Sequence, residues 1–223
     1  MIANPKPKSE RTISRTRNLH LNRGSFCFIR QKIPNGDLEG CHFQPKTWNA
    51  MVRLLQTSVA PTLQRFTCSI SGSNATHADV MVLMEHGVRH MCCLEVLHVM
   101  MTAIDLWDAK CDELLLTLPA SLRLLHLDMG SVHSFTSTNL RFLSNLEILV
   151  LQVPEGDIYR LELPPRLQRF SLDICEGTMH TSLCIPSTVF KITLFAVQGN
   201  LPENVLRVGQ CQHLEDIESA VFT

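Results

Sequence analysis

The chain has 223 residues, of which 45% are hydrophobic and 18% are charged, and its formal net charge is -1. This balance excludes an intrinsically disordered chain, because disorder goes with low hydrophobicity and high net charge. No uninterrupted apolar run approaches the roughly 18 residues of a membrane span, so we expect no membrane insertion. Leucine accounts for 32 of the 223 residues, and this excess indicates a leucine-rich globular protein.

The nine cysteines are odd in number and include no Cys-x-x-Cys pair, so the sequence predicts no disulfide framework. The N-terminal residues lack the apolar segment of a secretory signal. We therefore expect a reduced intracellular compartment, with the cytoplasm as the first choice. The mitochondrion is the alternative, because the N-terminal region is basic, contains serine and threonine, and is poor in acidic residues.

Positive charge is concentrated at the N-terminus. Residues 1–32 contain eight lysines and arginines and one acid, a net +7, whereas the remaining residues contain 12 basic and 20 acidic side chains, a net -8. A solvated tail, a targeting segment and a contact with RNA phosphates all fit such a segment. We expect residues 1–12 to form a basic flexible arm. The candidate contacts with nucleic acid or an acidic partner are Lys6, Lys8, Arg11, Arg15 and Arg17.

A repeat of the form apolar-x-x-apolar-x-apolar runs along the chain, as in Leu122-Arg-Leu-Leu125-His-Leu127. Two weaker copies begin at Thr16 and Leu214. Seven clear copies begin at Leu38, Leu63, Leu94, Leu122, Leu146, Leu167 and Val189. Successive copies start 21 to 31 residues apart. Such a period predicts a solenoid, in which each repeat buries its apolar side chains against its neighbours.

The repeats resemble those of the leucine-rich repeat family, in its LP-x-x-L-x-x-L-x-L subtype. A proline precedes the first apolar position of four copies, at Pro61, Pro119, Pro164 and Pro186, and a glycine recurs at Gly156, Gly177 and Gly199. The Asn or Cys that the family carries three residues after the last apolar position is present only as Cys175. The resemblance therefore describes divergent, irregular repeats.

This resemblance implies an α/β leucine-rich repeat solenoid, a horseshoe with a parallel β-sheet on its concave side. We expect one domain of about 8–9 irregular repeats over residues 13–223. The longer middle repeats have room for convex helices, which we place at residues 47–56, at residues 76–91, and from Thr102 onwards. After about residue 150 the repeats shorten, and we expect extended or short-helical convex segments there.

Catalytic and metal-binding motifs are weak in this sequence. His86 and His90 have the spacing of a zinc-binding pair, with Cys92 and Cys93 nearby, but no second paired motif follows. No nucleophile elbow and no phosphate-binding loop is present. We therefore predict no enzymatic activity, no metal site, no cofactor and no small-molecule substrate.

The positions between the apolar residues of each repeat are expected to face outward from the sheet. In the middle repeats several of these positions are themselves apolar and form a patch with a polar rim, which is typical of an interaction site. The candidate partner-binding residues on this concave face are Val96, His98, Met100, Leu124, His126, Asp128, Ile148 and Val150. The sequence thus predicts a non-catalytic protein–protein interaction module or scaffold. The alternative is a structural subunit of a large ribonucleoprotein or other assembly, whose basic N-terminal segment contacts the RNA backbone.

Overall fold

The computed structural model describes most of the chain from residue 62 onwards and two strands before it. The described residues are 30–32, 37–43, 62–71, 76–102, 105–106, 111–129, 131–135, 138–153, 155–174, 176–197, 206–207 and 214–222. The basic arm at residues 1–12, the first weak repeat and the expected helix at residues 47–56 lie outside them. Among the described residues, no helix is both long and apolar enough to span a membrane.

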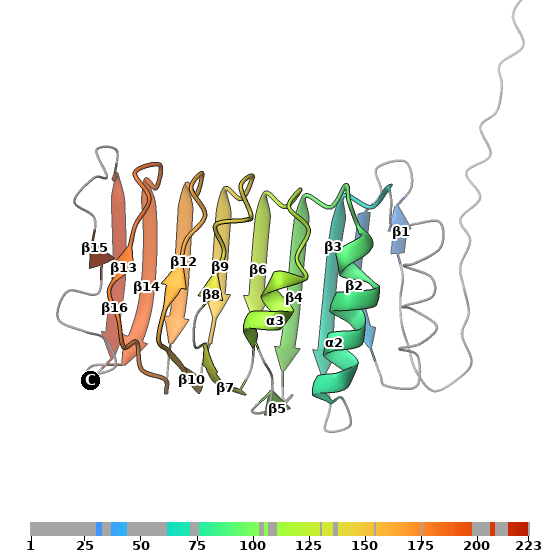
Figure 1. Cartoon of the computed structure of the whole chain (residues 1–223), viewed down its shortest axis with the longest axis horizontal. Coiled ribbons are helices and arrows are strands. Elements are labelled where there is room, and N and C mark those ends of the chain that lie inside the picture. Colours follow the sequence, from blue (N-terminus) through green and yellow to red (C-terminus); the bar gives the residue numbers. More distant parts are fainter. Residues whose placement is uncertain are drawn as a thin grey trace, which may run out of the picture.

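A nine-stranded sheet, ordered β1-β2-β3-β4-β6-β9-β12-β14-β16, forms one side of the molecule. Its strands lie side by side in one row (Figure 1). The strand bounds are β1 Arg30–Lys32, β2 Asp37–Phe43, β3 Arg65–Ser71, β4 Val96–Thr102, β6 Leu124–Asp128, β9 Ile148–Gln152, β12 Arg169–Ile174, β14 Lys191–Val197 and β16 Asp216–Phe222. Every neighbouring pair is parallel except β1 and β2, which are antiparallel. The expected parallel sheet is therefore confirmed from β2 onwards, and β1 is an antiparallel addition at its edge.

The second layer consists of short strands and two α-helices. The short strands are β5 Asp105–Leu106, β7 Ser131–Phe135, β8 Thr138–Asn139, β10 Glu155–Ile158, β11 Leu161–Glu162, β13 Leu183–Cys184 and β15 Leu206–Arg207. They form three small parallel sheets, ordered β10-β7-β5, β11-β8 and β13-β15. Helices α2 (His77–His86) and α3 (Cys111–Leu116) lie on the same side of the large sheet in Figure 1, and a 3-10 turn spans Val88–His90. The described chain is thus a parallel β-sheet solenoid with few helices.

The apolar positions of the repeats form the core between the two layers. In the six copies from Leu63 to Leu194, all three apolar positions are buried: Leu63, Phe66, Cys68, Leu94, Leu97, Val99, Leu122, Leu125, Leu127, Leu146, Leu149, Leu151, Leu167, Phe170, Leu172, Val189, Ile192 and Leu194. The predicted register of these copies is confirmed. The last copy differs, because Ile217 is 49% exposed on β16, at the end of the strand order. A repeat at the end of a solenoid has a neighbour on one side only.

Helix α2 follows the local signals in its sequence. The Thr76 hydroxyl accepts a hydrogen bond from the Asp79 backbone N–H at 3.3 Å, and the Asp79 carboxylate accepts one from the Thr76 N–H at 2.9 Å. This reciprocal capping box supplies side-chain acceptors to the Thr76 and Asp79 N–H groups at the start of the helix. The helix then buries Val80, Leu83 and Met84 against the sheet, as predicted.

We expect Thr76→Ala to lower the free energy of unfolding by about 0.5–2 kcal/mol, because the substitution removes the hydroxyl that caps the helix. Thr76→Ser keeps a capping hydroxyl and is the matched control. Denaturant unfolding of the two variants measures the difference. Equal losses for alanine and serine would show that the hydroxyl contributes nothing to stability.

The prediction of a helix beginning at Thr102 is wrong. Thr102 ends β4, and Asp105 and Leu106 form β5, which pairs in parallel with Ser131 and Val132 of β7. The helix of this repeat, α3, begins only at Cys111. Backbone pairing with the next repeat therefore outcompetes the local capping pattern, which carries no information about neighbouring repeats.

Candidate functional site

The outward face of the large sheet carries the predicted partner-binding residues, in the predicted register. Val96 pairs with Leu124, and Leu124 pairs with Ile148, so three apolar side chains stand in one row across β4, β6 and β9. In the same way His98, His126 and Val150 form a second row, and Met100, Asp128 and Gln152 form a third. We call the eight residues Val96, His98, Met100, Leu124, His126, Asp128, Ile148 and Val150 the open-face patch.

All eight residues of the open-face patch are half-buried, whereas the side chains that alternate with them along each strand are buried. This alternation follows from the pleat of a β-strand, which sends successive side chains to opposite faces. The patch side chains shield one another, but the described residues place no second layer on top of them. The face therefore presents partly exposed apolar surface in the middle of the sheet.

Charged side chains flank the patch along its first row. Arg65 of β3 pairs with Val96, and Arg169 of β12 pairs with Ile148, so an arginine stands at each end of the apolar row. The Arg169 guanidinium also lies 5.4 Å from the centre of the Phe190 ring, within the range of a cation–π contact. The first row thus has an apolar centre with an arginine at each end, whereas the third row holds Asp128 and, beside Gln152, Asp173.

The two patch histidines stack on each other. The ring centres of His98 and His126 are 4.0 Å apart, with an angle of 10° between the ring planes. The Nε2 atom of His126 lies 3.2 Å from Oε1 of Gln152, whereas Nε2 of His98 is buried without a hydrogen-bond partner among the described residues. Gln152 belongs to this cluster but was not among the predicted site residues, although it occupies the same outward position of its repeat as Met100 and Asp128.

Protonation of His98 is disfavoured at this site. Burial lowers the pKa of His98, and charge on the adjacent His126 lowers it further, while the Asp128 carboxylate opposes both effects. His98 therefore resists the charged state in the folded protein more than it does in the unfolded chain. The His98 side chain consequently stays neutral to a lower pH than an ordinary histidine does.

We expect the free energy of unfolding to fall as the pH drops from about 7.5 to 5.5, because the unfolded chain takes up a proton at His98 before the folded protein does. The contribution of His98 to the free energy of unfolding is complete above its ordinary pKa of about 6.5. It is lost as the pH falls toward the lowered pKa that His98 has in the folded protein. His98→Phe keeps a flat ring without a titrating group. Unfolding curves across this range should show a shallower pH slope for the variant, and identical slopes would contradict this account.

The weaker candidate site around His86 and His90 is not assembled. His86 ends α2, and His90 lies in the separate 3-10 turn after Gly87, so the two histidines do not share one helix. Cys92 and Cys93 are exposed and form no disulfide within the described residues. The part of the chain that the structure describes contains no cluster of three His, Cys, Asp or Glu side chains able to hold a metal ion.

The architecture and the open-face patch together describe a β-solenoid with a partly apolar sheet face that no described residue covers. No family model, no curated protein and no solved structure matches this chain. What the protein does is therefore inferred from its own residues.

Proposed function

We propose that this chain is a non-catalytic protein-interaction module that binds a partner protein on the open face of its large sheet. The observation that carries the proposal is the row of Val96, Leu124 and Ile148, three half-buried apolar side chains in register on adjacent strands. A contiguous apolar patch bordered by polar residues is typical of protein interfaces. Its burial contributes about 25 cal/mol per Å² of apolar surface, before the cost of association.

The partner that fits this face has an apolar centre bordered by acidic groups. Arg65 and Arg169 stand at the two ends of the apolar row, and Arg169, at the β12 end, can face a carboxylate of a bound protein. Opposite charges at the rim contribute mainly to orientation and association rate, whereas the buried apolar centre contributes most of the affinity.

We assign the solenoid to the leucine-rich repeat type, with the large sheet on the concave side of a horseshoe and α2 and α3 on the convex side. The buried LxxLxL positions and the prolines that precede four of them support this assignment. Extended solenoids commonly bind partners on a concave surface. Fold type alone does not define function, so the proposed binding role depends on the patch itself.

Affinity capture from the native source, with and without nuclease, tests the proposal. We expect the captured protein to stay bound after nuclease treatment, because the contact is between protein surfaces. Loss of every captured protein on nuclease treatment would contradict this expectation. It would instead support the alternative, an assembly subunit whose basic residues Lys6, Lys8, Arg11, Arg15 and Arg17 contact RNA phosphates.

A further inference from the structure

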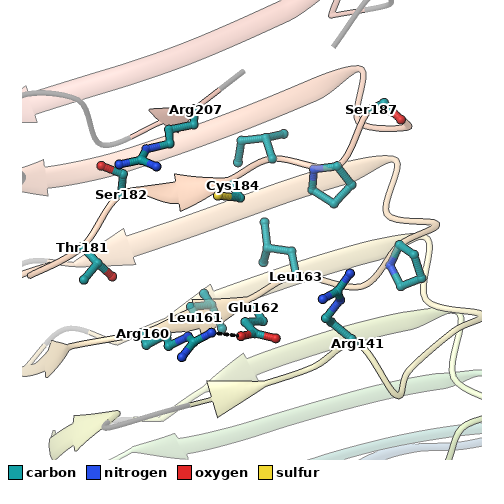
Figure 2. A pocket seen from close by; sticks show the side chains of 13 residues that line it. Arg141, Arg160, Leu161, Glu162, Leu163, Thr181, Ser182, Cys184, Ser187 and Arg207 are labelled. Atoms are coloured by element: carbon teal, nitrogen blue, oxygen red, sulfur yellow. Dashed lines mark hydrogen bonds and ion pairs between the residues drawn. The ribbon is translucent and has the colours of Figure 1, made fainter. Parts of the chain in front are cut away.

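A second surface feature lies in the layer of short strands, away from the open-face patch. It is a groove of about 650 Å³ between β11 and β13, a volume within the range of sites for small organic ligands. Its floor includes Leu161, Leu163 and Ile185, and each of these is less than 10% exposed. Three arginines and one glutamate are among its other lining residues (Figure 2).

The groove forms because two neighbouring repeats separate at this point. Ile158 and Met179 still form a parallel bridge, with the His180 N–H donating to the Ile158 carbonyl at 2.9 Å. Beyond it, β11 pairs only with β8 and β13 pairs only with β15, so no ladder joins β11 to β13 in the described chain. Pro165 and Pro186, which lack a backbone N–H, line the groove beyond these strands.

The groove carries excess positive charge. Arg160 forms an ion pair with Glu162, the only carboxylate among the lining residues. Arg141, which follows β8, and Arg207 of β15 form no ion pair within the described residues. Guanidinium groups stay protonated at all physiological pH values, so two positive charges without an ion-pair partner among the described residues border an apolar floor.

The two arginines stand apart. Figure 2 shows Arg207 beside Ser182 at one side of the groove and Arg141 at the other, with Leu163 and Cys184 between them. A ligand that uses both arginines must therefore carry an acidic group at each end and an apolar part in the middle. The planar guanidinium fork binds phosphate or carboxylate through two parallel hydrogen bonds.

We infer that this groove binds a small organic anion with acidic groups at both ends and an apolar spacer. The Ser182 hydroxyl adds a donor beside Arg207, which favours phosphate over carboxylate because phosphate offers more acceptor oxygens. The inference is independent of the proposed partner-binding role. It concerns different strands and a different class of ligand.

Isothermal titration of the full chain with hexanediol bisphosphate tests this inference, and suberate, a dicarboxylate with an apolar spacer, is the second ligand. Saturable binding of either ligand supports the site, and the tighter of the two identifies the preferred acid. We expect Arg141→Gln and Arg207→Gln each to weaken binding roughly tenfold or more, since a hydrogen bond to a charged group contributes enough for such a change. Arg166→Gln removes an exposed arginine that does not line the groove, and it should bind as the wild type does.

Inorganic phosphate and hexanol phosphate, which carries a single acidic group, are the remaining ligands. Binding of either as tightly as the bisphosphate would overturn the two-ended site. Absence of saturable binding by both two-ended ligands would overturn the inference altogether. So would equal weakening by Arg166→Gln, because that result would reflect net charge and not the groove. Thermal unfolding of each variant confirms that the fold is retained.

Discussion

Leu125→Ala is expected to lower the free energy of unfolding by about 2–5 kcal/mol. Leu125 is fully buried on β6, between β4 and β9 in the strand order. Its removal leaves a cavity that the surrounding repeats cannot easily fill, because parallel strands on both sides hold the backbone in place. Denaturant unfolding of the wild type and the variant measures the loss.

Leu124→Ala is the matched control for this substitution. Leu124 precedes Leu125 on the same strand but points to the open face and is half-buried. We expect it to cost about 1 kcal/mol or less, because less apolar surface leaves water when it folds. Similar losses at the two positions would contradict the alternation of faces, and a loss below about 0.5 kcal/mol at Leu125 would contradict its core position.

From β3 to β16 the register of the sheet could be predicted from the sequence, because one pattern determines both pairing and burial. The copy that begins at Leu38 departs from the prediction, because β2 is shifted and Cys41 pairs with Cys68 instead of Phe66. The second apolar position of successive repeats holds Phe66, Leu97, Leu125 and Leu149, and these residues pair directly across neighbouring strands. A shift of one residue would turn every apolar side chain to the open face, so the apolar repeat selects one register. The rows of the open-face patch follow from the same register.

Other features depend on contacts that no local pattern specifies. The segment after Thr102 carries a capping pattern, yet Asp105 and Leu106 pair with β7. The stacked rings of His98 and His126 depend on side-chain conformations as well as on register. The groove places Arg141 and Arg207, from different repeats, at its two sides, and no motif in the sequence predicts it.

Leu124→Glu and Ile148→Lys are expected to abolish capture of the proposed protein partner while leaving the midpoint of thermal unfolding nearly unchanged. Both side chains stand in the apolar row of the open-face patch, and both are partly exposed. A charge at either position stays hydrated in the free protein, but a partner surface would strip its water without offering a matching charge. The change therefore acts on binding and not on folding. Capture followed by quantitative mass spectrometry, with thermal unfolding of each variant, measures both effects.

Two control variants, one on the sheet surface and one in the core, separate an effect on binding from an effect on folding. Phe195→Glu places a charge on an exposed apolar residue of β14, on the same sheet face but outside the patch, and should leave capture intact. Leu149→Lys places a charge in the core beside Ile148 and should unfold the protein, because a buried unpaired charge is strongly destabilising. Unfolding by Leu124→Glu and Ile148→Lys as well would show that these residues point inward. Unchanged capture by two folded variants would show that the open-face patch is not the binding site, and the basic N-terminal segment would then be the stronger candidate.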